Sequence, residues 1–307
     1  MTQLAPIALF AYRRRGHLER VLSALRSNIL ARDSYLVIFC DGPRGPSDSE
    51  EVEAVRREAR RATGFRHIEI REASENQGLA LSLTTGLDFM LYHWDRVIVV
   101  EDDILVSRHF LDYMNHNLAN YENSVQVASI HGAVYPHSAD LPETFFIRGA
   151  DCWGWATWRR AWEVFEPDGA QLLKELQARG LLDAFNFEGT APFEEMLIDQ
   201  VEGRIDSWAI RWYASTLLNE MLTLYPRVPM AVNIGEDGTG THGSSRGQSW
   251  PGPYEAPLVS RQVPILESSS GREAFRRYFR TRYRIPTSKL GRLAWRRARR
   301  LRQSLRT

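Results

Sequence analysis

The sequence predicts an α/β protein whose mostly parallel sheet is covered by helices on both faces. Two observations carry this prediction. Continuously apolar runs are typical of strands that are buried on both sides, and they lie at 6–11, 35–40 and 96–100. Segments with the helical spacing of apolar residues follow these runs, at 17–28, 50–63 and 79–93. Strands that alternate with helices indicate βαβ units with right-handed crossovers.

The rest of the chain continues this pattern with shorter elements. Residues 66–71 alternate, with Ile68 and Ile70 on one side, and predict a further strand. Beyond Val125 the predicted elements are helices at 172–182 and 192–202 and a strand at 222–232. We expect three parts, at 1–124, 125–270 and 271–307.

The composition is that of an ordinary globular protein. It combines 43% hydrophobic residues with a net charge of +1, so no overall field draws the protein to nucleic acid. Cys40 and Cys152 are too few for a disulfide framework and predict buried free thiols. No apolar stretch approaches the roughly 18 residues of a membrane span, and the N-terminus lacks a signal-peptide pattern. We therefore expect a cytoplasmic protein.

The loops after the predicted strands are the expected binding region. In open α/β sheets, ligands bind beyond the carboxyl ends of the strands. The loops concerned are 11–15, 41–44, 76–78 and 101–103. Asp41 and Asn76 are polar residues in two of them, and either could hydrogen-bond a base or a ribose, although Asp-Gly-Pro is also an ordinary turn.

Three adjacent carboxylates, Glu101, Asp102 and Asp103, directly follow an apolar strand. They repel one another and lose hydration there, and a divalent cation removes that conflict. Hard oxygen ligands suit Mg²⁺ or Mn²⁺, which commonly share a site with phosphate oxygens. The competing interpretation is a solvated acidic turn. The sequence therefore predicts a metal and diphosphate site.

His242 lies in a glycine-rich loop, 235–243, whose backbone could approach a ligand closely. A neutral imidazole suits a transition-metal ion, so His242 as a metal ligand would favour Mn²⁺ over Mg²⁺. An ordinary surface histidine is the competing interpretation.

Asp206 and Arg211 flank large aromatic rings. A carboxylate beside apolar rings is a better base, and Arg211 could hold a phosphate or keep Asp206 ionised. The alternative is a helix N-cap at Asp206, with Trp208 and Trp212 one turn apart in the core. The segment 153–155 is similarly open to two interpretations, a wall on which sugars stack or core packing.

The C-terminal segment 286–307 contains eight basic residues and no acidic one. Its apolar residues fall near one helical face, with Trp295 beside it. We expect an amphipathic helix that could contact an anionic membrane surface; a solvated terminal helix is the alternative. No nucleic-acid-binding module is recognisable, so we expect no nucleic-acid partner.

The order of these motifs resembles the GT-A glycosyltransferases, in particular the bacterial family 2-like group and the N-acetylglucosaminyltransferase I type. The segments that carry the resemblance are 10–13, 41–42, 76–78, 101–103, 153–158, 206–214 and 233–242. The resemblance implies a Rossmann-like GT-A fold, with a nucleotide-sugar-binding half at 1–124, an acceptor half at 125–270 and a basic tail at 271–307.

The resemblance also implies a role for each matching residue. Asp103 would bind the metal with His242, Asp102 would contact the ribose or the metal shell, and Glu101 the donor sugar. The residues placed around the nucleotide would be Phe10, Ala11, Tyr12, Arg13, Asp41, Asn76 and Gly78. Gly154 and Trp155 would flank the donor sugar. Asp206 matches the catalytic base, and Asp199 and Glu195 are alternatives because the commoner Glu-Asp base motif is missing.

The implied activity is a Mn²⁺- or Mg²⁺-dependent, inverting transfer of a sugar from a nucleotide donor to an acceptor hydroxyl. We expect a UDP-sugar donor and a glycan or lipid-linked acceptor of polysaccharide biosynthesis. Two other functions are open. A nucleotidyltransferase would use the arginines of 11–16 on a triphosphate. A non-catalytic nucleotide-sugar-binding scaffold would need no base.

Overall fold

The computed structural model describes residues 3–235, 252–258, 261–286, 290–291 and 294–295. The strands are β1 (Ile7–Ala11), β2 (Tyr35–Cys40), β3 (His67–Glu72), β4 (Arg96–Glu101), β5 (Ile104–Val106), β6 (Val127–His131), β7 (Thr144–Ile147), β8 (Trp155–Trp158), β9 (Leu222–Pro226) and β10 (Ala231–Asn233). Eight of them form one sheet in the order β3-β2-β1-β4-β8-β6-β9-β7, and β5 pairs with β10 in a second, two-stranded sheet.

The large sheet is mostly parallel. Strands β3, β2, β1 and β4 are parallel neighbours, and their register aligns Phe10 with Phe39 and with Glu101. Only β8 and β7 run opposite to the other strands of this sheet. β1, β2 and β4 are almost wholly buried, as their continuous apolar runs require. The predicted α/β class with a mostly parallel, helix-flanked sheet is confirmed.

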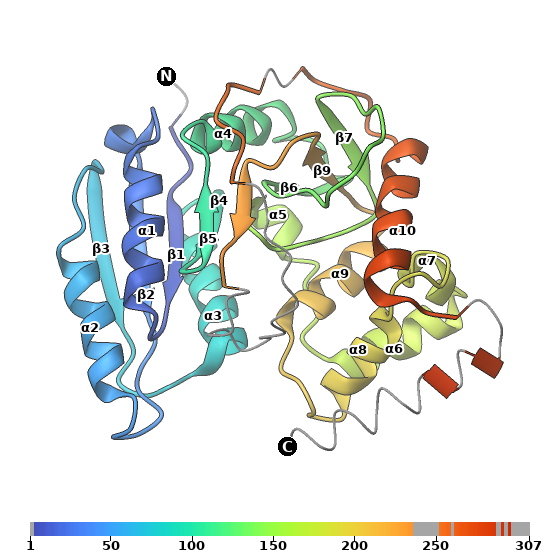
Figure 1. Cartoon of the computed structure of the whole chain (residues 1–307), viewed down its shortest axis with the longest axis horizontal. Helices are drawn as coiled ribbons and strands as arrows, with labels where there is room; N and C mark the ends of the chain where they lie inside the picture. The colour runs from blue at the N-terminus through green and yellow to red at the C-terminus, as the bar shows by residue number, and fades with distance from the viewer. Residues whose placement is uncertain (1–2, 236–251, 259–260, 287–289, 292–293, 296–307) are drawn as a thin grey trace.

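Three helices connect the parallel strands, namely α1 (Arg15–Arg26), α2 (Ser49–Arg60) and α3 (Gly78–His93). α1 lies within the helical segment predicted at 17–28 apart from its first two residues, and it buries Leu18, Val21, Leu22 and Leu25. The chain steps outward through α1 and α2 and returns across the sheet through α3 (Figure 1). Right-handed crossovers therefore place α3 on the opposite face from α1 and α2. The carboxyl ends of β1, β2 and β4 meet at one edge.

The remaining helices of the second half are mostly short. They are α5 (Arg159–Trp162), α6 (Gly169–Ala178), α7 (Leu182–Phe185), α8 (Phe193–Val201) and α9 (Trp208–Leu218). The first half also contains α4 (Phe110–Asn120) and a 3₁₀ turn, Ala31–Asp33, which precedes β2. Trp155 of β8 is buried against the rings of Trp208 and Trp212 of α9, with centroids 5.6 and 5.9 Å away. The second half therefore joins the same sheet and contributes an aromatic cluster to the common core.

The predicted strand at 222–232 is wrong in one respect, because two strands occupy it. β9 ends at Pro226, and β10 begins at Ala231. β9 joins the large sheet, whereas β10 pairs with β5. Proline has no N–H to extend a ladder, so it is a suitable last residue for β9. Of the predicted helices, 172–182 and 192–202 correspond to α6 and α8.

A long helix, α10 (Ser269–Tyr283), occupies the start of the basic tail expected at 271–307. The Ser268 hydroxyl caps it by accepting a hydrogen bond from the Gly271 N–H at 3.1 Å. Phe275 and Phe279 are 1% and 2% exposed and pack on aromatic rings of the second half. This part of the tail is thus a docked helix. Most of 286–307, where the amphipathic helix was predicted, lies outside the described residues.

In the part of the chain that the structure describes, no helix has both the length and the apolar character needed to cross a bilayer. Cys40 and Cys152 are free and buried, as predicted.

Candidate donor-binding site

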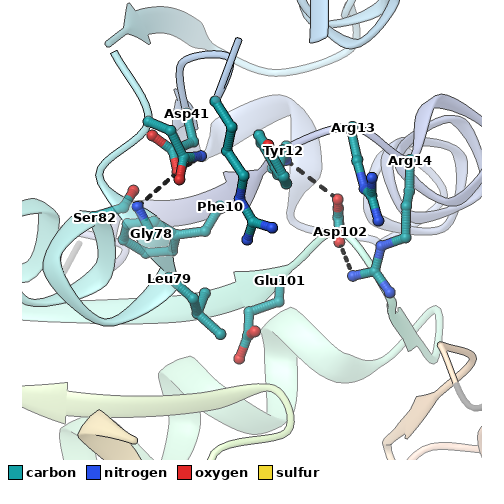
Figure 2. Close-up of a pocket in the computed structure, with 13 residues that line it drawn as sticks. Phe10, Tyr12, Arg13, Arg14, Asp41, Gly78, Leu79, Ser82, Glu101 and Asp102 are labelled. Carbon is teal, nitrogen blue, oxygen red and sulfur yellow. Dashed lines mark hydrogen bonds and ion pairs between the residues drawn. The ribbon is translucent and has the colours of Figure 1, made fainter. Parts of the chain in front are cut away.

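A cleft of about 220 Å³ opens at the carboxyl ends of β1, β2 and β4 (Figure 2). It is lined by Phe10, Ala11, Tyr12, Arg13, Arg14, Asp41, Arg44, Asn76, Gly78, Leu79, Ser82, Glu101 and Asp102. Nine of the predicted site residues are in this lining, and they come from four separate loops. The structure thus brings together the nucleotide side of the predicted site, at the edge where α/β sheets bind ligands.

Asp41 organises one wall of the cleft. Its Oδ1 accepts the N–H groups of Gly42 and Gln77, both at 2.8 Å. Its Oδ2 accepts the Asn76 side-chain amide at 2.9 Å and the Gly78 N–H at 3.1 Å. A carboxylate has about four acceptor positions, so Asp41 is saturated by its own chain. Asp41 therefore positions the turn into α3, and the base contact predicted for it stays a prediction.

The turn into α3 needs a glycine at Gly78, whose φ is +75°. Only glycine adopts this conformation without steric cost. The Asn76 amide also donates to the Gly42 carbonyl oxygen at 3.0 Å, which fastens this turn to the loop after β2. The two loops on this side of the cleft are consequently held as one unit.

The ring of Tyr12 lies between charged groups at the mouth of the cleft. Its hydroxyl donates to Asp48, and the Arg44 guanidinium lies 5.5 Å from the ring centroid. Burial, followed by the hydrogen bond and charge of Asp48, raises the pKa of Tyr12 to about 12. Tyr12 is therefore a neutral aromatic surface at physiological pH, suited to stacking.

The carboxylates of Asp102 and Asp103 share one cation, the guanidinium of Arg14. Nη2 of Arg14 donates a hydrogen bond to Oδ1 of Asp102 and lies 3.0 Å from Oδ2 of Asp103. The Tyr12 N–H donates to the other Asp102 oxygen at 3.3 Å. The three side chains are only 19%, 5% and 14% exposed for Arg14, Asp102 and Asp103. The predicted charge conflict is thus partly relieved by the chain itself.

Glu101 lines the cleft, and its carboxylate points away from the Arg14–Asp102 pair, on the side of Leu79 (Figure 2). Its burial, then the charges of Asp103 and Asp102, raise its pKa to about 8, against a lowering by Arg14. Burial likewise raises the pKa of Asp102, while Arg14 lowers it. Glu101 is therefore largely protonated at neutral pH and can donate a hydrogen bond to a sugar hydroxyl or a phosphate.

The small sheet carries the start of the glycine-rich loop to these carboxylates. β10 pairs with β5, and the Ile234 N–H donates to the Asp103 carbonyl at 2.8 Å. Gly235 lies so close that an added Cβ would be 2.3 Å from Oδ2 of Asp103. Only glycine allows this approach. His242, the predicted second metal ligand, lies outside the described residues.

Asp102 and Asp103 fit a divalent cation as two of its ligands. Their oxygens converge on a single cationic nitrogen, so both can reach one ion position. Carboxylate oxygens suit Mg²⁺ and Mn²⁺. In residues 3–235 and the other described segments, no three His, Cys, Asp or Glu side chains converge to hold a metal. Further ligands would therefore come from a bound nucleotide or from the glycine-rich loop.

Asp206 and Arg211, the predicted base and its partner, lie at the start of α9 and do not line the cleft. Asp206 is 66% exposed, and its Oδ1 is 3.4 Å from Nη2 of Arg211. The helix N-cap is Ser207, which accepts from the Ile210 N–H at 3.4 Å, so the alternative of a cap at Asp206 is wrong. Arg211 also donates to two backbone carbonyls, which orients it toward Asp206.

The other predicted residues of the second half are more enclosed. Asp199 is buried and ion-paired with Arg204 at 2.6 Å, and Glu195 is half-buried on α8. Trp155 is fully buried in the aromatic core, and Gly154 is buried with its carbonyl accepting the Gly132 N–H at 2.7 Å. Neither faces the cleft. Core packing at Trp155 explains the aromatic segment 153–155. We therefore leave Gly154 and Trp155 out of the proposed site.

Four cleft residues were not predicted from the sequence. They are Arg14, Arg44, Leu79 and Ser82. The arginine run at 13–15 did indicate positive charge after β1, but nothing in it distinguishes Arg14 from its neighbours. The structure does: Arg13 and Arg15 are exposed, whereas Arg14 turns inward to the carboxylates.

No protein-family model matches this sequence, and no curated protein matches it. Solved structures do match, at low similarity. A mannosyltransferase from Pyrobaculum calidifontis, in complex with GDP-Man and Mn²⁺, is 14% identical over 71% of this chain and 75% of its own, with a TM-score of 0.36. A cytidylyltransferase from Leptospira borgpetersenii is 12% identical over 52% of this chain, with a TM-score of 0.33, and the chain spans 62% of its length. At this level neither activity transfers to this chain.

Proposed function

We propose that this chain is a nucleotide-sugar glycosyltransferase of the GT-A type, which uses a divalent cation and inverts the transferred sugar. One observation carries the proposal. A cleft at the carboxyl ends of the parallel strands is lined by the Tyr12 ring, by three arginines and by Asp102, and Arg14 joins Asp102 to the neighbouring carboxylate of Asp103. An aromatic surface suits a base, and the charged groups suit a diphosphate and its cation.

The donor would extend along the cleft from Tyr12 to the carboxylates. Phe10, Ala11, Tyr12 and Arg13 would enclose the base, and the turn at 76–78, held by Asp41, would border the ribose. Asp102 and Asp103 would lie at the diphosphate. Protonated Glu101 would donate a hydrogen bond to the sugar.

In the proposed transfer, Asp206 takes the proton of the acceptor hydroxyl as that oxygen attacks the anomeric carbon. The bond from that carbon to the diphosphate oxygen breaks, and the nucleoside diphosphate leaves. Arg211 orients Asp206 through their ion pair. A bound Mn²⁺ or Mg²⁺ supplies Lewis-acid stabilisation of the leaving diphosphate. Because Asp206 does not line the cleft, this role requires the donor sugar to extend from the cleft toward α9, so that the attacking hydroxyl lies within hydrogen-bond reach of Asp206.

The direct test is release of a nucleoside diphosphate from a panel of nucleotide sugars with Mn²⁺, repeated with EDTA. We expect release from one donor, abolished by EDTA and by Asp103→Ala. Release that continues in EDTA would contradict metal dependence, and no release from any donor would contradict the transferase assignment.

The base assignment has its own test. Asp206→Asn should lower transfer by about 10²-fold or more while nucleotide binding, measured by calorimetry, stays intact. Asp183→Asn, an exposed carboxylate on α7, is the matched control. Normal transfer by Asp206→Asn together with loss in Glu195→Gln or Asp199→Asn would move the role to one of those alternatives.

A nucleotidyltransferase is the second candidate, and one observation favours it. Arg13, Arg14 and Arg44 all line the cleft, and three guanidinium groups suit a triphosphate. The products distinguish the two functions. A nucleotidyltransferase incubated with a nucleoside triphosphate and a sugar phosphate releases pyrophosphate, whereas the glycosyltransferase releases a nucleoside diphosphate.

We also propose that the acceptor is a glycan or a lipid-linked sugar presented at an anionic membrane, with the segment 286–307 as the contact. Its eight basic residues support this. Deletion of 286–307 should reduce co-sedimentation with vesicles that contain anionic lipid. Unchanged co-sedimentation would remove the proposal.

A further inference from the structure

Arg14 occupies the position that a divalent cation would need. The same nitrogen, Nη2, pairs with oxygens of both Asp102 and Asp103. All three side chains are largely shielded from water, so their Coulomb interactions are much stronger than those of a surface ion pair. A cation bound by these two carboxylates would therefore compete with Arg14 for the same oxygens.

The net charge of the site favours replacing the Arg14 guanidinium by a divalent cation over holding both cations at once. Two carboxylates and one guanidinium sum to −1, and two carboxylates and one divalent ion sum to zero. Keeping both cations at the pair would place them within a few ångströms of each other and leave a net charge of +1. Their repulsion in a shielded site opposes this arrangement unless an anion also binds.

The surroundings of Arg14 leave room for a second binding partner of its guanidinium. Its side chain lines the cleft. Its Nη1 is buried and has no hydrogen-bond partner within the described part of the chain. Of the two terminal nitrogens of the guanidinium, only Nη2 therefore contacts the carboxylates. The guanidinium fork matches two phosphate oxygens. Arg14 can thus transfer from the carboxylates to a diphosphate without leaving the cleft.

We propose that Arg14 is a resident counter-ion that yields the Asp102–Asp103 pair to a divalent cation when a nucleoside diphosphate takes up its guanidinium. The inference rests on the proposed function, because it deepens the role of that cleft. Its consequence is that cation and nucleotide bind cooperatively. By linkage, each ligand strengthens the other by the same factor.

The test is Mn²⁺ binding by the full chain, measured by electron paramagnetic resonance and calorimetry, with and without UDP or GDP. The parent should bind Mn²⁺ weakly alone and about tenfold or more tightly with nucleotide. Arg14→Ala and Arg14→Gln should bind Mn²⁺ alone at least about tenfold more tightly than the parent does, and the gain on adding nucleotide should be smaller than in the parent. Arg14→Gln keeps most of the side-chain volume in case the alanine variant folds poorly.

Arg15→Ala is the matched control, because it also removes one positive charge, at the next residue along the chain. The Arg15 side chain is exposed and pairs with Glu58 instead of with the two aspartates. It should behave like the parent. Equal or weaker Mn²⁺ binding by both Arg14 variants, or the same gain in Arg15→Ala, would overturn the inference. These binding readouts need no turnover. A chain that shows the exchange but transfers no sugar contradicts the proposed function alone, whereas transfer with unchanged Mn²⁺ binding in the Arg14 variants contradicts the exchange alone.

Discussion

At the scale of single residues, the cleft depends on side chains that the chain itself holds in place. The sequence predicts where Asp41 lies but not which groups it contacts. Its position after a buried strand correctly predicts that it lies at the cleft. Its four hydrogen bonds to 42 and 76–78 could not be predicted, because they depend on how two loops distant in sequence meet. The inward turn of Arg14 was unpredictable for the same reason.

Glu101 gives the protein a pH-dependent stability. Its pKa is raised to about 8 in the folded chain, so the folded state holds a proton that the unfolded state releases near 4.5. Stability from this group is complete below the unfolded pKa and is lost as pH rises through about 8, by at most about 1.4 kcal/mol per pH unit. Glu101→Gln should therefore become progressively more stable than the parent from pH 5 to about pH 8 in urea denaturation, with no further change above that pH.

The control for this prediction is Glu19→Gln, an exposed position on α1, which should follow the parent at every pH. A constant difference between Glu101→Gln and the parent across the range would mean that Glu101 is ionised throughout.

Asp41→Asn tests the positioning role of this carboxylate. The substitution replaces one acceptor oxygen by an amide that faces N–H donors, and a buried unsatisfied group of this kind costs about 2 kcal/mol. We expect that loss in the free energy of unfolding, together with weaker UDP or GDP binding. Asp33→Asn, on the exposed 3₁₀ turn, should change neither. Weaker nucleotide binding at unchanged stability would instead favour direct contact with the ligand.

At the scale of elements, β1, β2 and β4 were predictable because strands buried on both faces are apolar along their length, with polar residues only at the two ends of β4. Short elements were not. β5 is three residues long, and its partner β10 lies more than 120 positions away. α10 was also missed as a docked helix, because most of its residues are polar and few face the core.

The β5–β10 ladder sets the position of the glycine-rich loop relative to Asp103. Gly235→Ala would place a methyl group against Asp103 and 2.8 Å from Nη1 of Arg14. We expect Mn²⁺ affinity in the presence of UDP or GDP to fall about tenfold or more, with the thermal midpoint nearly unchanged. Gly45→Ala, where an added Cβ has open space, is the control. Unchanged Mn²⁺ affinity in Gly235→Ala would show that this close approach does not matter.

Helix α10 should contribute to the stability of the second half. Phe279 is 2% exposed among other rings, so Phe279→Ala should cost about 3 to 5 kcal/mol in the free energy of unfolding. Tyr92→Ala, at a side chain that is 80% exposed, should change little. If Phe279→Ala lowered the free energy of unfolding as little as Tyr92→Ala does, α10 would not be stably packed on the second half.

At the scale of the whole molecule, one sheet joins the strands that border the cleft to the aromatic second half (Figure 1). Alternation of strands and helices predicted the first half, but the second half depends on ring packing that sequence spacing describes poorly. Trp155 shows this, since its motif suits a sugar wall and a core equally, and the structure places it in the core. Asp206 stays a proposal because its relation to a bound donor depends on both halves together.

The most direct test of the donor site is a crystal structure of the chain with Mn²⁺ and UDP or GDP, using anomalous scattering to locate the metal. We predict an anomalous peak between Asp102 and Asp103, the nucleotide in the cleft beside Tyr12, and the Arg14 guanidinium on a phosphate. A nucleotide bound away from this cleft, or a cleft-bound nucleotide with Arg14 still on both carboxylates and no metal peak, would contradict the account.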